Sequence, residues 1–324
     1  LNPARKFNIN LGDNMAGCTL VDGTSAGTYP ASVSNFILNP DLTSLSLSQS
    51  GNDVIVGSDA IYLHGSSGND ANDGSSATFA VKTFKRARER LYATGGNTII
   101  VVGSANLGNA DETSDWDLSF NPNAKVLRGL GYLSYMVLIP SGKTLTLSDI
   151  TIDGNKENVY TGTGASNAII YSDGGGLIIK DGAKIQSNTF YGAYLTRATS
   201  SVRMEGGEIS DCAYGIHHVS GESFAMTGGL IHSNTSYGLY TNNVKTLDIG
   251  GTAKISENSN GVYVVSVDSI RITGGQITEN SSYGLNIYRN ISSNISALLI
   301  SGGDFSNNGA YGLYAASGNA NQYY

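Results

Sequence analysis

The sequence predicts an all-β protein, a right-handed parallel β-helix (a solenoid) with a short N-terminal helical cap. The first observation is an internal repeat, in which a glycine and a β-branched run lead to an Asn and then to an aromatic–Gly–apolar–polar stretch. Six copies begin at Gly182, Gly207, Gly229, Gly251, Gly275 and Gly303, so one copy spans between 22 and 28 residues. A repeat of this length is typical of one turn, or rung, of a solenoid that contacts only its neighbours.

The second observation is the period within each copy. Short segments such as Leu247-Asp248-Ile249 and Ile270-Arg271-Ile272 place apolar residues at every second position, which is the period of a β-strand. Three such strands fit into one copy. Because successive copies run in the same direction, their strands are expected to pair in parallel and wind into a coil.

The third observation is that equivalent residues form ladders when the copies are stacked. An Asn ladder is interrupted once, by Cys212, and contains Asn188, Asn234, Asn258, Asn280 and Asn308. Each Asn amide is expected to donate to the carbonyl of the next. The glycine after the aromatic residue never varies, which indicates a positive φ or close packing. An inward apolar stack is predicted for Ala193, Ile216, Leu239, Val262, Leu285 and Leu313.

Composition limits the function. Of 324 residues, 42 are glycine and only 14% are charged, and the net charge is −7 without a basic run. This disfavours nucleic acid and anionic membranes as partners. No apolar stretch is long enough for membrane insertion, and the start at Leu1 without a leader favours a mature chain or an excised fragment. Cys18 and Cys212 could form a disulfide, although two unpaired thiols are favoured, and no spacing predicts a zinc or other metal site.

The chain divides into two parts. Residues 1–58 are rich in Ser, Asn and Gly and are expected to form a small β element or a linker. Residues 59–324 are assigned to the β-helix, with a cap at 59–96, irregular rungs at 97–179 and regular repeats at 180–324. Within the cap a helix is predicted over 81–92, ended by Gly95-Gly96, and the first rung is expected to begin at 98–102.

Two stretches carry a resemblance. Residues 61–76, with the helix that follows, are similar to the N-terminal cap of secreted bacterial right-handed β-helix proteins of the pectin-lyase-like superfamily. Residues 145–155 and 177–188 resemble repeats of adhesin-like cell-surface β-helices. The resemblance implies a bacterial extracellular or cell-surface location. It leaves two functions open, because the superfamily holds polysaccharide lyases and glycoside hydrolases as well as proteins with no catalytic site.

An enzyme would need clustered carboxylates, because glycosidic cleavage needs a general acid and a base or nucleophile. Glu257 and Glu279 share one register on adjacent rungs and could share a proton or a calcium ion. Asp149 and Asp153 flank one strand and Asp173 lies about one rung later, so these three could bind calcium or act in acid–base chemistry. The Asp153-Gly154 pair favours a turn instead. Calcium is the only cofactor left open.

Asp70 and Asp73 lie in a Gly-rich polar loop, and an Asx-turn cap is expected there.

A binding protein would need an exposed recognition surface, and one stripe of planar residues fits. Tyr194, His217, Tyr240, Tyr263 and Tyr314 occupy one outward column at rung spacing, which suits a neutral glycan or polysaccharide; ladder stabilisation is the alternative. A second column is expected to point toward the core or its corner and comprises Tyr191, Tyr214, Tyr237, Tyr283 and Tyr311. His218 is expected at the core margin, satisfied by a neighbour.

The charge pattern decides between the two functions at this stage. The outward column of aromatic residues holds no carboxylate, and the neighbouring outward column (Arg203, Asp248, Arg271) has compensating charges. We therefore predict a non-catalytic surface protein that binds a glycan or a host or cell-surface protein. A polysaccharide lyase or glycoside hydrolase with its site between Trp116 and Asp173 is the alternative.

Overall fold

The computed structural model describes residues 60–162, 164–289 and 297–317, together with the backbone of four short strands nearer the N-terminus. These four are β1 (Cys18–Leu20), β2 (Phe36–Leu38), β3 (Leu45–Ser50) and β4 (Asp53–Ser58). β1 pairs with β2 and β3 pairs with β4, both antiparallel. The alternating segment near residue 45 thus forms a β element.

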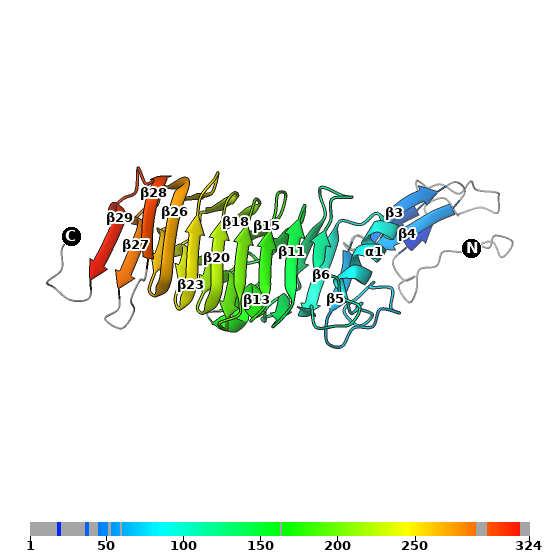
Figure 1. Ribbon diagram of the computed structural model, residues 1–324. Helices are drawn as coiled ribbons and strands as arrows, with labels where there is room; N and C mark the ends of the chain where they lie inside the picture. The colour runs from blue at the N-terminus through cyan, green and yellow to red at the C-terminus, as the bar shows by residue number, and fades with distance from the viewer. Residues whose placement is uncertain are drawn as a thin grey trace, which may run out of the picture.

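The remaining strands form an elongated parallel coil (Figure 1). Each regular rung contributes one strand to each of three faces, and strands on a face pair in parallel with the rung before and after, as β16 does with β13 and β19. The parallel solenoid predicted from the repeats is confirmed.

The first face, here called the tyrosine face, is a nine-stranded sheet. It contains β7 (Ala105–Asn106), β10 (Val137–Pro140), β13 (Ala168–Asp173), β16 (Tyr191–Thr196), β19 (Tyr214–His218), β22 (Tyr237–Thr241), β25 (Asn260–Val264), β27 (Tyr283–Arg289) and β29 (Tyr311–Ser317). A 3₁₀ helix, η3 (Ala165–Asn167), precedes β13.

The other two faces belong to one large sheet, joined through the long strand β26 (Val267–Thr278). The second face contains β8 (Asp115–Asp117), β11 (Thr144–Ser148), β14 (Gly176–Ile179), β17 (Ser201–Met204), β20 (Gly221–Met226), β23 (Val244–Ile249) and β28 (Ala297–Asp304). The third contains β5 (Ala60–His64), β6 (Thr98–Gly103), β9 (Lys125–Arg128), β12 (Thr151–Asp153), β15 (Lys184–Gln186), β18 (Glu208–Ser210), β21 (Leu230–His232) and β24 (Lys254–Ser256).

The core is a continuous column of aliphatic side chains inside the coil. The predicted inward stack from Ala193 to Leu285 is fully buried, which confirms its register. Its last member, Leu313, is 45% exposed, because it lies on β29 at the end of the sheet order. Burial of apolar area along the whole coil is the main stabilising contribution.

The two glycines of each repeat serve different purposes. The first, such as Gly229 with φ 84°, occupies the left-handed region. The second, such as Gly238, does not; a Cβ there would lie 2.8 Å from the carbonyl oxygen of Gly261 on the next rung. Of the two explanations open from sequence, close packing therefore holds for the invariant second glycine.

The helix α1 (Phe84–Thr94) lies at the N-terminal end of the coil and buries Phe84, Ala87 and Leu91. It begins three residues later than predicted. Val81 instead bridges to Leu63, and Thr83 caps the helix by accepting a hydrogen bond from the Arg86 N–H. Gly95 ends the helix in the left-handed conformation, as predicted.

The coil also begins earlier than predicted. The first strand of the coil is β5, which pairs in parallel with β6. The chain therefore leaves this sheet after β5, forms α1, and returns to the same sheet at β6. No described helix is long and apolar enough to cross a membrane.

Candidate functional site

The aromatic column on the tyrosine face has the predicted register. Tyr194 pairs with His217, His217 with Tyr240, and Tyr240 with Tyr263. The column continues through Asn286 to Tyr314 at the C-terminal end. Toward the N-terminus it is one residue longer than predicted, because Tyr171 pairs with Tyr194. Leu138 holds the next register position, and Tyr135 stacks on Tyr171 from the loop before β10. We call Tyr135, Tyr171, Tyr194, His217, Tyr240 and Tyr263 the tyrosine track.

Successive rings of the track contact one another. The Tyr171 and Tyr194 ring centroids are 6.0 Å apart with near-parallel planes, and those of Tyr240 and Tyr263 are 5.4 Å apart at 10°. His217 lies edge-on between Tyr194 and Tyr240, at 5.2 and 4.6 Å. Because part of each face is covered by the next ring, the track presents ring edges and hydroxyls to solvent as well as exposed parts of the faces.

The second tyrosine column packs beside the track. The ring centroids of Tyr191 and Tyr194 are 4.8 Å apart, and those of Tyr214 and His217 are 5.1 Å apart. Strict alternation breaks at the glycine: Gly192 and Ala193 are both buried, so the residues on either side of this pair lie on the same outer side of the strand. The expectation that this column points to the core is therefore wrong, although its place beside the corner is right.

The phenol groups of the track are free donors. Among the described residues, the hydroxyls of Tyr171, Tyr194, Tyr240 and Tyr263 make no hydrogen bond within the protein. Partial burial, followed by neighbouring tyrosines, raises the pKa of Tyr194, Tyr240 and Tyr263 above the ordinary value. These groups therefore remain protonated, and able to donate, well above neutral pH.

His217 is neutral within the track. Burial lowers its pKa to about 4, and its Nδ1 atom is buried without a hydrogen-bond partner among the described residues. The adjacent His218 lies on the inner side, fully buried, where its Nε2 is 2.9 Å from Ser200 Oγ. The expected neighbouring partner is confirmed for Nε2, whereas Nδ1 of His218 is buried without a partner among the described residues. With no charged side chain among its members at neutral pH, the track is an uncharged surface.

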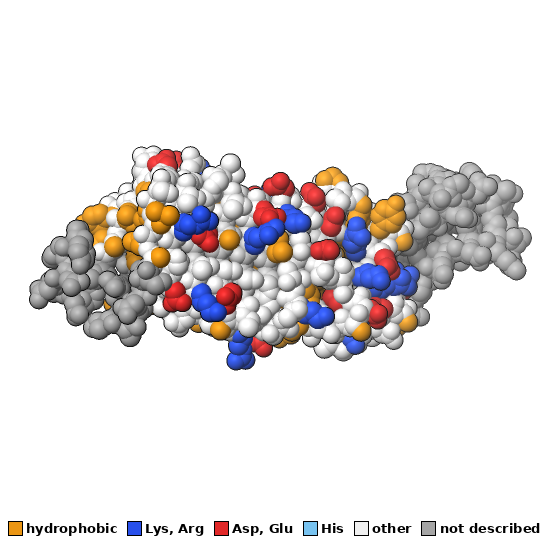
Figure 2. Space-filling model, in the orientation of Figure 1, with side chains coloured by type: hydrophobic (Ala, Val, Ile, Leu, Met, Phe, Trp, Pro, Cys, Tyr) orange, Lys and Arg blue, Asp and Glu red, His pale blue; other side chains and the backbone are white. Residues whose placement is uncertain are grey.

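The other two faces carry compensating charges. Arg271 Nε donates to Asp248 Oδ1 at 2.8 Å on the second face, and Arg203 pairs with Glu205 there. Lys184 Nζ lies 3.1 Å from Glu208 Oε2 on the third face. Figure 2 shows charged groups of both signs interspersed along the visible side. The interpretation of the Arg203–Arg271 column as charge-compensated is confirmed.

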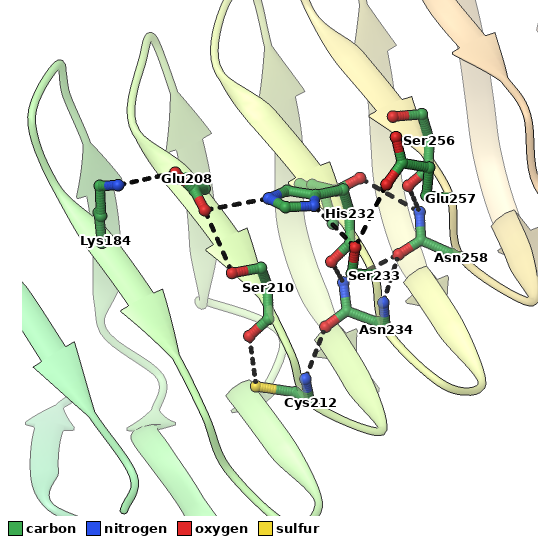
Figure 3. A network of polar contacts seen from close by, with 11 residues as sticks. Lys184, Glu208, Ser210, Cys212, His232, Ser233, Asn234, Ser256, Glu257 and Asn258 are labelled. Carbon is green, nitrogen blue, oxygen red and sulfur yellow. Dashed lines mark hydrogen bonds and ion pairs between the residues drawn. The ribbon is translucent and has the colours of Figure 1, made fainter.

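The carboxylates of Glu257 and Glu279 have different partners. Both occupy the left-handed position directly before a ladder Asn, with φ 59° and 60°. Glu257 accepts a hydrogen bond from Ser233 Oγ at 3.4 Å, whereas Glu279 lies 3.7 Å from Lys254 Nζ. Figure 3 shows Glu257 at the end of an outer polar row that runs from Lys184 through Glu208, His232 and Ser233.

Within that row, partial burial acts to raise the pKa of Glu208. Hydrogen bonds from His232 and Lys184 outweigh it, so the pKa lies below the ordinary value.

The three aspartates of the irregular rungs do not come together. Asp149 lies in the bend between β11 and β12, at φ 44°. Asp153 accepts from the Asn155 N–H at 2.8 Å, so the turn interpretation is confirmed. Asp173 belongs to the tyrosine face and pairs with Arg197 at 2.6 Å. Among the described residues no group of three His, Cys, Asp or Glu side chains could hold a metal ion.

Asp70 and Asp73 stabilise the cap. Asp70 accepts from the N–H groups of Lys82 and Thr83, and Asp73 accepts from the Ser75 N–H. The Asx-turn prediction is confirmed.

The Asn ladder lies inside the corner next to this row (Figure 3). Asn258 Oδ1 accepts from both the backbone N–H and Nδ2 of Asn234, and Asn280 repeats the pattern for Asn258. Cys212 donates its backbone N–H to Asn234. Its thiol is buried and free, and burial raises its pKa to about 12, so it is unreactive at neutral pH. The side chain of Cys18 lies outside the described residues.

Arg128 is a buried residue that the repeat pattern did not reveal. It is fully buried on β9, donates to Asn188 Oδ1 at 3.1 Å and also contacts the carbonyl groups of Gly154 and Ala168. Burial lowers its pKa to about 10, so it remains a cation at neutral pH. Arg128 comes two residues after the inward Val126, and the period of a strand could therefore have predicted that it also points inward. It begins the Asn ladder.

These features define a right-handed parallel β-helix protein with an uncharged aromatic track on one face. Residues 135–295 match the family model described as the right handed beta helix region. No curated protein and no solved structure matches the chain.

Proposed function

We propose that this protein binds an extended, uncharged glycan along the tyrosine track, as a non-catalytic protein at a bacterial cell surface or outside the cell. The tyrosine track itself carries the proposal. Parallel rungs repeat at about 4.8 Å, which is close to the advance per sugar along an extended β-linked chain. Successive rings and hydroxyls can therefore meet successive sugars.

The chemistry of the track suits sugars. A sugar ring has apolar C–H surfaces and many hydroxyls, and tyrosine offers a ring surface and a phenol donor on one side chain. The absence of charge in the track favours a neutral polysaccharide. On the other two faces ion pairs already satisfy the charges described above, such as Arg271 with Asp248.

Binding rather than cleavage is proposed because most of the carboxylates considered from sequence are held by other groups. Glycosidic hydrolysis needs two carboxyl groups about 5 to 10 Å apart across one bond. Here Asp153 serves a turn, Asp173 pairs with Arg197, and Glu279 pairs with Lys254.

The test measures binding to a panel of neutral polysaccharides (β-glucans, xylan, galactan and mannan) by affinity electrophoresis. Size-exclusion chromatography of the same polymers detects any cleavage. The variant Tyr240→Ala/Tyr263→Ala should weaken binding about tenfold, because two ring surfaces and two phenol donors are lost. Tyr160→Ala is the control, since Tyr160 is 74% exposed and outside the track.

A second variant separates rings from hydroxyls. Tyr240→Phe/Tyr263→Phe keeps the ring stack and should give an intermediate loss. If no polymer binds, or if the Tyr160 control weakens binding as much as the track variant, the proposal fails. Shortening of any polymer would show cleavage and contradict the non-catalytic proposal, and the acidic residues considered from sequence would then be the ones to substitute.

A further inference from the structure

A cavity of about 420 Å³ opens at the N-terminal end of the tyrosine track. It lies among the turn after β5, the start of β7 and the loop before β10, and Tyr135 lines it. The same ring stacks on Tyr171 at 5.0 Å. The cavity is therefore continuous with the track, and a ligand extended along the track would reach it with its end.

Lys82, Asn106 and His64 can donate hydrogen bonds to a ligand in the cavity, whereas Ser104 and Tyr132 donate to the Tyr135 carbonyl and Asn109 donates to the Gly65 carbonyl. Lys82 is half-buried, and its ammonium forms no ion pair among the described residues. Asn106 uses its Oδ1 to accept from the Gly108 N–H at 2.7 Å, which leaves its Nδ2 hydrogens available. His64 accepts from the Ser67 N–H through Nδ1, so the neutral ring carries its hydrogen on Nε2.

No carboxylate lines the cavity. Of the acidic residues close to the lining in sequence, Asp70 accepts from the backbone N–H groups of Lys82 and Thr83, Glu112 accepts from the Phe84 N–H at 2.8 Å, and Asp111 is exposed. In a chain with a net charge of −7, an unpaired, half-buried cation beside two further donors is a local positive site. Such a site favours an anion that can accept several hydrogen bonds.

We propose that this cavity binds an anionic group (carboxylate, sulfate or phosphate) on the terminal sugar of a glycan whose remaining, uncharged sugars lie on the track. This inference rests on the proposed function for the identity of the ligand, but the cavity makes its own prediction for small anions. The protein would then bind the body of a chain through uncharged contacts and one end of it through charge.

The experiment uses isothermal titration calorimetry with three probes: sodium glucuronate, inorganic sulfate, and a pair of oligosaccharides of the best-binding neutral polymer with and without a terminal carboxylate. Lys82→Met removes the charge but keeps the apolar stem. It should weaken glucuronate and carboxylated oligosaccharide about tenfold and leave the neutral oligosaccharide unchanged. Lys143→Met is the matched control, because Lys143 is exposed, forms no described ion pair and lies outside the cavity.

The two proposals fail separately. Loss of neutral-oligosaccharide binding in Tyr240→Ala/Tyr263→Ala, with glucuronate binding intact, supports both. Glucuronate binding that depends on Lys82, with no polymer binding at all, supports the cavity and overturns the track. If glucuronate and sulfate do not bind, or if Lys82→Met and Lys143→Met weaken them equally, the cavity proposal is overturned. Sulfate binding without any preference for the carboxylated oligosaccharide leaves a small-anion site and overturns the terminal-sugar assignment.

Discussion

The regular rungs after residue 180 and the irregular rungs before it solve the same packing problem differently. In the regular rungs each position is filled by equivalent residues on successive turns, as in the Asn ladder and the aliphatic stack. In the early rungs single residues do the corresponding work: Arg128 begins the ladder, and Trp116 stacks on Phe84 at 4.1 Å beneath the helix. Repetition makes the middle of the coil uniform, whereas its start depends on residues that have no substitutes.

The largest effect is expected at the start of the coil. Trp116 is fully buried, so Trp116→Ala should lower the free energy of unfolding by about 4 kcal/mol through lost burial and a cavity. Urea denaturation followed by far-ultraviolet circular dichroism measures it. Trp116→Phe is the control, because the Trp116 Nε1 has no partner among the described residues and the ring stack would persist. An equal loss in both variants would contradict the role assigned to the ring.

In the regular rungs, Asn258→Ala should lower the free energy of unfolding, measured by urea denaturation, by about 3 kcal/mol. The substitution leaves the Asn234 N–H and the Ile231 carbonyl unpaired inside the coil. Asn260→Ala is the comparison, since the Asn260 side chain makes only longer bonds of 3.3 and 3.5 Å outside the ladder. If both variants unfold at the same urea concentration, the ladder contributes no more than an ordinary surface amide.

A pH-dependent effect is expected from Glu112 beside the helix. Burial, and to a smaller extent Asp70, raises its pKa to about 7, above the ordinary 4.5. Between these pH values the folded chain binds more protons than the unfolded chain, so stability falls as pH rises from 4.5 to 7.

The free energy of unfolding of Glu112→Gln should therefore exceed that of the wild type by about 2 to 3 kcal/mol at pH 8 and by little at pH 4. Thermal unfolding across this range measures the difference. A stability difference that does not change with pH would contradict the raised pKa.

A smaller effect with the opposite sign is expected in the track. Because burial lowers the pKa of His217 to about 4, the unfolded chain binds more protons between pH 6.5 and pH 4, so stability falls as pH drops through this range. His217→Tyr copies the neighbouring rungs and should reduce that loss by about 2 kcal/mol.

Acid unfolding measures this difference for His217→Tyr. Acid unfolding of His218→Thr, which copies Thr241 on the next rung, shows how much of the acid sensitivity belongs to the inner histidine. An acid-unfolding midpoint that is the same in His217→Tyr and the wild type would refute the assignment.

The same contrast explains what could be predicted. Comparing copies within the chain was sufficient for the register of Tyr194, His217 and Tyr240, because one position in one copy predicts its neighbours. Tyr171 was missed because the early excursions hide its register. Tyr135 was missed because it stacks on Tyr171 from the loop before β10, while Leu138 holds the register position. The cavity was missed because it joins residues from β5, β7 and the loop before β10, which no periodicity connects.

Two interpretations failed for local reasons. The second tyrosine column was expected to point toward the core or its corner, and the core alternative is wrong because the buried pair Gly192 and Ala193 places both flanking residues on the outer side. The helix start was placed at Val81 because its apolar spacing fits a helix, but a strand bridge to Leu63 takes that residue. In both cases backbone geometry at one or two residues overrode a correct hydrophobic pattern.

The bond from each rung to the next through the Asn ladder also makes the coil a ruler. The three junctions from Asn234 to Asn308 use the same donor and the same acceptor. The Gly-to-Gly approach, as between Gly238 and Gly261, recurs at these junctions as well. Excising residues 238–260 would join Tyr237 directly to Gly261 and restore the repeat at the junction. Gene duplication or deletion could therefore lengthen or shorten this protein in whole steps without inventing a new interface.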